Sequence, residues 1–426
     1  MALTILLGSL ALLLVLGAPV AFALFAASAL TFLYLDIAPI VAVQRLASGI
    51  NVFSLMAIPF FIFAGDLMYR AGIAERLVRL ADAALGRARG GLGQVDVGAS
   101  MLFGAVSGSA VASVSALGSA LVPMMEEKGY DRDYAVNVTC TAAILGLIIP
   151  PSHNMIIYAA ASGVGVSIAD LFLAGVVPGL MAGAFLMVAA RYVAVRRGYP
   201  KGVFPGWSAF SRAAFAAIPG LMTALIIVVG ILAGVFTPTE SSAVAIGYTV
   251  LVAFFGYRSL GRAGFGLAVA GSVRSTAMVM LIIGSAAAFG WLLALLEVPA
   301  GLAGLVTSLT DEPTLIILII VIVLLILGTF MDMAPLIIIT TPIFLPVAQT
   351  AGVDPVHFGI VLMLALGIGL VTPPVGSVLF VGAAIGKLKV EEAVRSIWPF
   401  YLALIAALLL TAFVPAISLS LPRLFR

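Results

Sequence analysis

The sequence predicts an all-α polytopic membrane protein built from two inverted-topology repeats. Composition is the first indication, because 63% of the 426 residues are hydrophobic, 9% are charged and the mean hydropathy is +1.26. So little polar surface does not cover a soluble protein of this size. The second indication is an internal repeat, in which residues 123–163 match residues 346–386 without a gap at an offset of 223. We predict about ten transmembrane spans and two re-entrant helical hairpins.

Apolar stretches of about 20 residues mark the spans, since that length crosses the hydrocarbon core. Two further apolar stretches, 91–127 and 313–349, carry Gly, Ser or Pro near their middles and are predicted to be the hairpins. The segments 36–53 and 257–274 are too polar to span and are predicted to be arms along the membrane interfaces. The predicted spans are 2–18, 20–35, 54–70, 132–160, 167–193, 213–235, 238–256, 275–295, 355–386 and 390–422.

Helix-breaking residues recur at matched positions of two of these spans. Gly146 corresponds to Gly369, and the pair Pro150-Pro151 corresponds to Pro373-Pro374. Proline removes a backbone donor and clashes with the preceding turn, so each pair interrupts its helix. The sequence therefore predicts two broken membrane helices, 132–160 and 355–386, the device with which secondary transporters form a binding site.

Positive residues set the predicted orientation, because they concentrate in cytoplasmic loops. With Arg87 and Lys387 both on the cytoplasmic side, the first hairpin enters from the cytoplasm and the second enters from outside, so the repeats are inverted. The predicted organisation is an N-terminal repeat (1–193), a cytoplasmic linker (194–212) and a C-terminal repeat (213–426).

The breaks also indicate a chemistry. Carbonyls freed at the end of one half-helix suit a cation, and the N–H groups at the start of the next suit an anion. Two breaks thus predict at least two sodium sites around one anion site. Sodium is favoured over a transition metal because the available ligands are carbonyl and hydroxyl oxygens. Asp332, an acidic residue in an apolar hairpin, is predicted either to contact substrate or a coupling ion, or to cap a helix.

Other chemistries find little support in the sequence. A phosphate loop, a Gly-x-Ser-x-Gly elbow and a His-Glu-x-x-His helix are all missing, so we expect an ion gradient rather than ATP to supply energy. A net charge of +3 gives no reason to expect nucleic-acid binding. We interpret Cys140 as a packing residue, Glu240 as a dipole partner at a helix start, and His357 as interfacial.

Several motifs resemble the large membrane subunit of tripartite ATP-independent periplasmic (TRAP) transporters, and the resemblance covers nearly the whole chain. They are Ser107-Gly108-Ser109-Ala110-Val111-Ala112, Gly129-Tyr130-Asp131, Ile149-Pro150-Pro151-Ser152, Ala174-Gly175-Val176-Val177-Pro178-Gly179, Phe236-Thr237-Pro238-Thr239-Glu240, Asp354-Pro355-Val356-His357-Phe358-Gly359 and Thr372-Pro373-Pro374-Val375-Gly376.

This resemblance implies an elevator, in which the hairpins and broken helices form a transport domain that slides against a scaffold in the bacterial inner membrane. It also implies sodium-coupled import of a carboxylate, such as a C4-dicarboxylate or a sugar acid. The implied partners are a small four-helix membrane subunit and a periplasmic substrate-binding protein.

Site residues follow from the same resemblance, motif by motif. One departure is Ser113, where many relatives carry an acidic residue. The implied ligands of one sodium ion are Ser107, Gly108, Gly146 and Pro150, those of the other are Gly369, Thr372 and Pro373, and the residues that approach substrate are Ser109, Ser152 and Asp332.

Two alternatives remain at this point. One is a self-sufficient ion-coupled anion transporter or exchanger that needs no binding protein. The other is an intramembrane enzyme or structural scaffold, which would require a catalytic constellation that the motifs do not supply.

Overall fold

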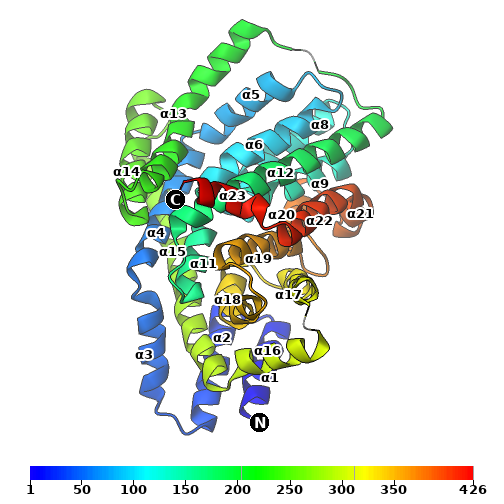
Figure 1. The fold of residues 1–426 in the computed structure, drawn as a ribbon. Coiled ribbons are helices and arrows are strands. Elements are labelled where there is room, and N and C mark those ends of the chain that lie inside the picture. The colour runs from blue at the N-terminus through cyan, green and yellow to red at the C-terminus, as the bar shows by residue number, and fades with distance from the viewer. Residues whose placement is uncertain (203, 311, 426) are drawn as a thin grey trace.

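The computed structural model describes residues 1–202, 204–310 and 312–425, so residue 203 of the predicted linker lies outside the described part (Figure 1). The described chain is helical throughout, with an isolated β-bridge between Arg89 and Lys201. The large apolar content is therefore organised as packed helices, in which every backbone polar group can be bonded inside its own segment.

The first 232 residues contain thirteen described α-helices, with short 3₁₀ and π segments between some of them. They are α1 (Ala2–Val15), α2 (Val20–Tyr34), α3 (Pro39–Ile50), η1 (Phe53–Met56), α4 (Ala57–Arg70), α5 (Ile73–Leu85), α6 (Gly91–Ser107), α7 (Ala110–Ser113), η2 (Val114–Gly118), α8 (Ser119–Glu127), α9 (Arg132–Ala143), α10 (Leu145–Ile148), α11 (His153–Ser162), α12 (Ile168–Arg196) and α13 (Trp207–Leu232).

The second half repeats the alternation of long helices and interrupted ones. Its elements are α14 (Pro238–Leu251), η3 (Val252–Gly256), α15 (Arg262–Leu295), α16 (Val298–Leu309), α17 (Pro313–Gly328), α18 (Met333–Thr350), α19 (Pro355–Gly369), α20 (Ser377–Ile385), α21 (Val390–Ser396), α22 (Trp398–Phe413) and α23 (Ala416–Leu424).

Fewer helices than predicted are long enough to cross a membrane. By length and composition, six described helices qualify, or up to eight if each of two bent pairs counts as one span. The helices α1, α2, α17 and α19 are apolar but have only 14 to 16 residues. The class of polytopic helical membrane protein is confirmed, whereas the count of ten spans stays a prediction.

The predicted second arm is wrong as a separate element. Residues 262–274 are the first part of α15, which continues without interruption for 34 residues. The segment contains Gly264, Gly266 and Gly271 but no proline, and isolated glycines weaken a helix without ending it. The prediction treated polarity as a helix boundary, although polar residues are readily accommodated at the end of a long helix.

Two predicted boundaries also move. The segment 390–422 is three helices rather than one span, with a bend of 64° between α21 and α22. Pro399 occupies the first turn of α22, where proline favours a new helix start over continuation. The linker is shorter than 194–212, because α12 ends at Arg196 and α13 begins at Trp207.

The two halves interpenetrate around the interrupted helices. In the first hairpin, Gly118 faces Ile385 of α20, which belongs to the second broken helix. In the second hairpin, α18 packs against α11, which belongs to the first broken helix. The hydroxyl of Tyr158 in α11 donates to the carbonyl of Pro355, 2.6 Å away, so the broken helices also bind each other directly.

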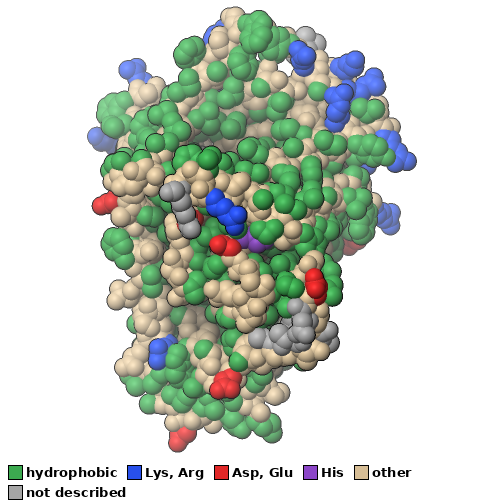
Figure 2. All heavy atoms as spheres, in the orientation of Figure 1, with side chains coloured by type: hydrophobic (Ala, Val, Ile, Leu, Met, Phe, Trp, Pro, Cys, Tyr) green, Lys and Arg blue, Asp and Glu red, His purple; other side chains and the backbone are tan. Residues whose placement is uncertain are grey.

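The surface is consistent with a lipid environment. Figure 2 shows one face with many apolar and few charged side chains, and with Lys and Arg side chains gathered over the end of the molecule where α5, α8 and α12 terminate. Large apolar side chains such as Phe215, Phe255 and Trp207 are more than 70% exposed. In water such exposure would be unfavourable, whereas hydrocarbon solvates it.

Candidate functional site

The first broken helix is interrupted at residues 149–152, where α10 ends and α11 begins, and the chain bends by 51°. Because Pro150 and Pro151 have no N–H, the carbonyls of Gly146 and Leu147 lose their helical donors. The hydroxyl of Ser152 replaces one of them by donating to the Leu147 carbonyl at 2.8 Å. The Gly146 carbonyl is left as an oxygen that the helix itself does not satisfy.

The second broken helix repeats this arrangement between α19 and α20. Pro373 and Pro374 remove the i+4 helical donors of the Gly369 and Leu370 carbonyls, and the Gly369 carbonyl accepts the N–H of Thr372 at 2.9 Å instead. The N–H of Val378 donates instead to the Leu370 carbonyl at 3.1 Å. Leu370 corresponds to Leu147 at the repeat offset. The equivalent carbonyl therefore gains a replacement hydrogen bond in both breaks, from a different donor in each. Both Pro-Pro bonds are cis.

Each break lies against the bend of the hairpin in its own half. A Cβ atom placed on Gly146 would lie 2.4 Å from the Cα of Gly104 in α6. A Cβ atom placed on Gly369 would likewise lie 2.4 Å from the Cα of Gly328 in α17. Separations this short exclude any side chain, so glycine is required on both sides of each contact. Gly146 and Gly369 are among the site residues predicted from the sequence, whereas Gly104 and Gly328 are not.

The bend of the first hairpin is held to its break by a side chain. Gly108 ends α6 with a positive φ of 60°, a backbone conformation that favours glycine. Its carbonyl accepts a hydrogen bond at 2.9 Å from the Nδ2 of Asn154, which is 2% exposed in the first turn of α11. Asn154 was not singled out from the sequence, since nothing local distinguishes an asparagine 46 residues away from its partner.

The bend of the second hairpin is held to its break by the backbone. Between α17 and α18, the Thr329 carbonyl accepts the N–H of Gly376 at 3.0 Å. Gly376 has a positive φ of 53° and is the N-cap residue of α20. Tyr401 of α22 adds a further contact, because its hydroxyl donates to the carbonyl of Val371 within the break. Tyr401 is a second residue that the sequence analysis missed.

The predicted site residues occupy these bends and breaks. The Ser107 hydroxyl lies 2.8 Å from that of Ser113. Ser109 caps α7 by accepting the N–H of Ala112. Thr372 donates to the Ile368 carbonyl at 2.8 Å, and Asp332 occupies the N-cap position of α18 with its side chain exposed. Ser152, by contrast, is fully buried, and its hydroxyl completes the break as described above.

A buried carboxylate joins the first hairpin to the base of the first broken helix. Asp96 in α6 is 0% exposed and is hydrogen-bonded by Ser100 at 3.3 Å and by Thr139 of α9. Asp96 is not among the acidic residues predicted from the sequence to be functional. Its signal was available, because Asp96 is the single acidic residue in the apolar stretch that became α6.

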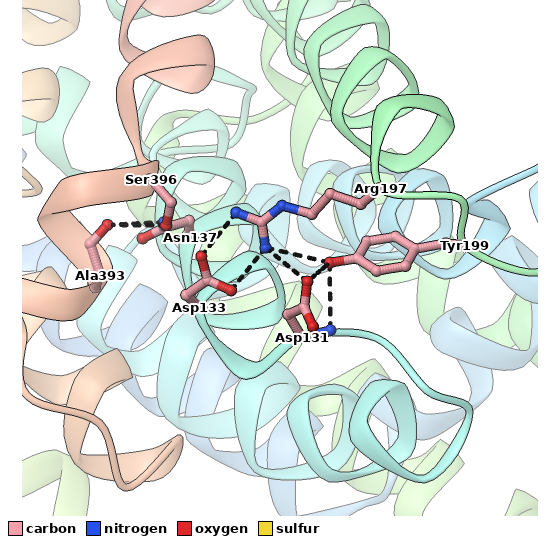
Figure 3. A network of polar contacts seen from close by, with 7 residues as sticks. All are labelled: Asp131, Asp133, Asn137, Arg197, Tyr199, Ala393 and Ser396. Carbon is pink, nitrogen blue, oxygen red and sulfur yellow. Dashed lines mark hydrogen bonds and ion pairs between the residues drawn. The ribbon is translucent and has the colours of Figure 1, made fainter.

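A polar network anchors the start of α9, as Figure 3 shows. Both oxygens of Asp133 accept from Arg197 at 2.8 Å, and Asp131 accepts from Arg197 and from the Tyr199 hydroxyl. One turn further along α9, Asn137 donates to Ala393 and Ser396 at the end of α21. The helix that leads into the first break is therefore fixed to α12 and to the second half of the chain.

The electrostatics of this network favour the neutral phenol and the charged guanidinium. Burial, together with the hydrogen bond to Asp131, raises the pKa of Tyr199 to about 12. Hydrogen bonding to Asp133 raises the pKa of Arg197 further above its already high ordinary value. The network keeps its donors and acceptors throughout the physiological pH range.

Two other predictions of single residues can be compared with the structure. His357 is 1% exposed and lies between Ser418 of α23 and Ala412 of α22, so its side chain is buried in the protein, and its place at the membrane interface stays a prediction. It follows Pro355 at the start of a span, but α23 folds back over that start. Glu240 forms a capping box with Thr237 at the start of α14, which confirms it as a partner of the helix end.

The comparison with protein families decides the identity. Residues 7–417 match the model described as "Tripartite ATP-independent periplasmic transporter, DctM component". The chain belongs to this family of large TRAP permeases. The family and the apolar helices together make it a protein of the bacterial inner membrane.

Individual relatives of this TRAP permease cover almost its full length. It is 41% identical over 424 residues to a protein of Salmonella typhimurium known as YgiK, across 99% of this chain and 97% of the relative. It is 37% identical to the 2,3-diketo-L-gulonate TRAP transporter large permease protein YiaN of Escherichia coli, across 94% of both chains. It is 40% identical to the C4-dicarboxylate TRAP transporter large permease protein DctM of Pseudomonas aeruginosa, across 87% of this chain and 86% of that one.

A solved structure shares the fold of this permease. The YdaH transporter of Alcanivorax borkumensis superposes with a TM-score of 0.61 across 86% of both chains, at 14% sequence identity. At that identity the likeness concerns fold alone. The helical fold is thus supported independently of the sequence relatives.

Proposed function

We propose that this permease imports an organic acid anion together with sodium ions, by an elevator movement of the hairpins and broken helices against the remaining helices. One observation carries the proposal: in each half, a helix broken by two prolines meets the bend of a hairpin through glycine on both sides. Backbone oxygens that lose their regular i+4 helical donors to proline then lie at both breaks, and such carbonyl oxygens suit hard monovalent cations.

The proposed sodium ligands are the residues at these two places. Gly146 contributes a carbonyl that has no helical donor, and Gly108 contributes a carbonyl held in place by Asn154. Ser107, Pro150, Gly369, Thr372 and Pro373 complete the two proposed sets. The bound cations would balance the charge of an anion held between the bends, for which Ser109, Ser152 and Asp332 are the proposed neighbours.

The substrate class follows from the relatives and from this chemistry. The names of the relatives from Escherichia coli and Pseudomonas aeruginosa specify 2,3-diketo-L-gulonate and C4-dicarboxylates, which are all carboxylates. The N–H groups at the starts of α11 and α20 offer positive ends of half-helices to such an anion. We therefore propose a C4-dicarboxylate or a sugar acid.

The proposed partners are those that the TRAP family implies. A periplasmic binding protein would deliver the anion, and a small four-helix membrane subunit would complete the permease. The proposed energy source is the sodium gradient, since moving one charge through 100 mV supplies about 2.3 kcal/mol.

The test is uptake into proteoliposomes that contain this chain and its small subunit, with the binding protein added outside. A panel of C4-dicarboxylates and sugar acids serves as the probe, under an inward sodium gradient or an equal potassium gradient. We expect uptake of at least one member with sodium only. Uptake that persists with potassium would contradict sodium coupling, and full uptake without the binding protein would favour the self-sufficient transporter.

A further inference from the structure

A cavity of about 260 Å³ lies between four helices. The proposed transport mechanism gives this cavity no role. The helices α3 and α15 run side by side on one flank, and α11 and α18 form the other (Figure 1). The volume is close to the lower limit of small-molecule sites, about 300 Å³. The lining residues are Gly49, Val52, Leu55, Ile157, Ala160, Ala161, Ile283, Ala286, Ala287, Gly290, Ile338 and Pro342.

The cavity has the chemistry of a hydrocarbon site. Every lining residue is aliphatic, a proline or a glycine, and several are small, so the walls bring no charged side chain toward an occupant. Space also remains beside the backbone, because a Cβ atom placed on Gly290 would meet nothing within 4 Å. In a bilayer, the most abundant apolar chain available to fill such a space is a lipid acyl chain.

A cation lies one helical turn from this lining. The guanidinium of Arg45 sits 4.7 Å from the centre of the Trp291 ring, and Phe32 stacks on the same ring at 5.5 Å. Arg45 precedes Gly49 by four residues on α3, and Trp291 directly follows Gly290 on α15. Since one turn rises about 5.4 Å, a molecule reaching both the cation and the cavity needs only a short connection.

The close packing of α3 against α15 fixes the position of Arg45 relative to Trp291. Gly49 lies so close to Ala287 that a Cβ atom on Gly49 would come within 2.2 Å of the alanine Cβ. The helices run antiparallel, so Arg45 is opposite Trp291 one turn away. The cation and the apolar space are therefore parts of one surface and do not depend on a flexible loop.

Arg45 has no counter-ion in the described part of the chain. No carboxylate there comes within 4.0 Å of it, and its side chain is exposed. A guanidinium binds phosphate through paired hydrogen bonds, and stacking on an aromatic ring restricts its motion. An exposed, ring-held arginine beside an aliphatic cavity complements a molecule with a phosphate at one end and a hydrocarbon chain at the other.

We propose that Arg45, Trp291 and this cavity bind an anionic phospholipid of the surrounding bilayer. The phosphate contacts Arg45, and one acyl chain occupies the space beside Gly290 and Ala161. The bound chain then touches α3 and α15 on one side and α11 and α18 on the other, so the lipid contacts helices of a hairpin and of a broken helix. The site is distinct from the breaks and does not require the proposed transport mechanism.

Native mass spectrometry of the purified, delipidated full chain tests the proposal. The probe is an equimolar mixture of phosphatidylglycerol and phosphatidylethanolamine with identical acyl chains. We expect the wild-type chain to retain one phosphatidylglycerol, with a preference of about fivefold, the factor typical of one arginine near an anionic lipid. Equal retention of the two lipids, or no retention, would overturn the proposal.

Two pairs of variants test separately the binding of the lipid headgroup and the binding of the acyl chain. Gly290→Phe places a large side chain in the open space of the cavity and should abolish retention of the lipid. Gly266→Phe, on the same helix at a position that also faces open space, should leave lipid retention unchanged. Arg45→Gln should keep the lipid and lose the preference, whereas Arg274→Gln, also exposed, should keep both. Wild-type retention in Gly290→Phe, or an unchanged preference in Arg45→Gln, would show that the lipid binds elsewhere. Arg45→Gln changes an exposed residue, so the headgroup test stands even where Gly290→Phe folds poorly.

Discussion

Gly104 of the first hairpin and Gly146 of the first broken helix meet backbone to backbone, and a Cβ atom on Gly104 would lie 2.3 Å from the Cα of Gly146. Gly328 and Gly369 make the same contact in the second half. Two contacts of this kind, each between a hairpin and a helix interrupted by two prolines, indicate that both halves pack the hairpin against the broken helix in the same way. In membranes, where water does not drive helices together, such close approach is an effective source of helix association.

Gly146→Ala should separate the first hairpin from its break. The added methyl group forces a backbone shift, which we expect to lower the free energy of unfolding by about 1–3 kcal/mol and to reduce sodium-dependent uptake. Thermal unfolding in detergent and uptake in proteoliposomes measure the two effects.

The matched control for this change is Gly247→Ala in α14, where a Cβ atom meets nothing within 4 Å. Alanine favours a helix over glycine by about 1 kcal/mol, so this control should be neutral or stabilising. Equal behaviour of the two variants would mean that the glycine contact does not constrain the site.

Asn154→Leu should loosen the bend of the first hairpin. The change removes the donor that binds the Gly108 carbonyl while nearly preserving volume, and a buried acceptor left without its donor costs about 1–3 kcal/mol. We expect sodium affinity to fall by about tenfold or more, measured as the sodium concentration for half-maximal uptake. Asn51→Leu, at an exposed position, is the control. An unchanged sodium dependence in Asn154→Leu would remove Asn154 from the account.

Asp332→Asn should impair uptake while the protein stays folded. Asp332 occupies the N-cap of α18, and asparagine is an equally good N-cap residue, so stability should change by less than about 0.5 kcal/mol. The lost negative charge should nevertheless reduce ion or substrate binding. Glu240→Gln, in a capping box away from the breaks, provides the comparison for charge loss alone. Wild-type uptake kinetics in Asp332→Asn would remove Asp332 from the proposed site.

Arg197→Gln should weaken the anchor of α9. It leaves Asp133, whose side chain is 23% exposed, without its two charged hydrogen bonds. We expect a loss of about 1–2 kcal/mol in stability, read from thermal unfolding. Arg196→Gln removes the neighbouring charge, which forms a 3.3 Å hydrogen bond to the Tyr192 hydroxyl and no ion pair in the described part of the chain, and should have almost no effect. Equal effects of the two substitutions would indicate a general charge effect.

The breaks could be predicted from the sequence because their cause is local. Pro150 and Pro373 lack an N–H wherever they occur, and a proline pair inside an apolar helix leaves few alternatives to an interruption. Gly146 and Gly369 could be found because the repeat offset marked them.

Other parts of the site depend on distant residues and could not be predicted. Asn154 reaches Gly108 across 46 residues, and Tyr401 reaches Val371 across 30. His357 is buried because α22 and α23 lie against α19 and contact both nitrogens of its ring. The second arm was predicted from the polarity of residues 257–274, although polarity does not end a helix that has no proline, as α15 shows. Tertiary packing decided each of these features.

The central claim is that the two interrupted helices bind sodium, and the most direct measurement is thermal unfolding of the purified chain at rising sodium concentration and constant ionic strength with choline. Each occupied site should stabilise the wild-type chain by about 2.7 kcal/mol when sodium exceeds the dissociation constant a hundredfold. In a variant with Pro150 and Pro151 both changed to Ala, restored helical hydrogen bonds should reduce this stabilisation, whereas Pro219→Ala in the uninterrupted α13 should preserve it. A wild-type unfolding temperature that does not respond to sodium, or a double variant that responds like the wild type, would contradict the account.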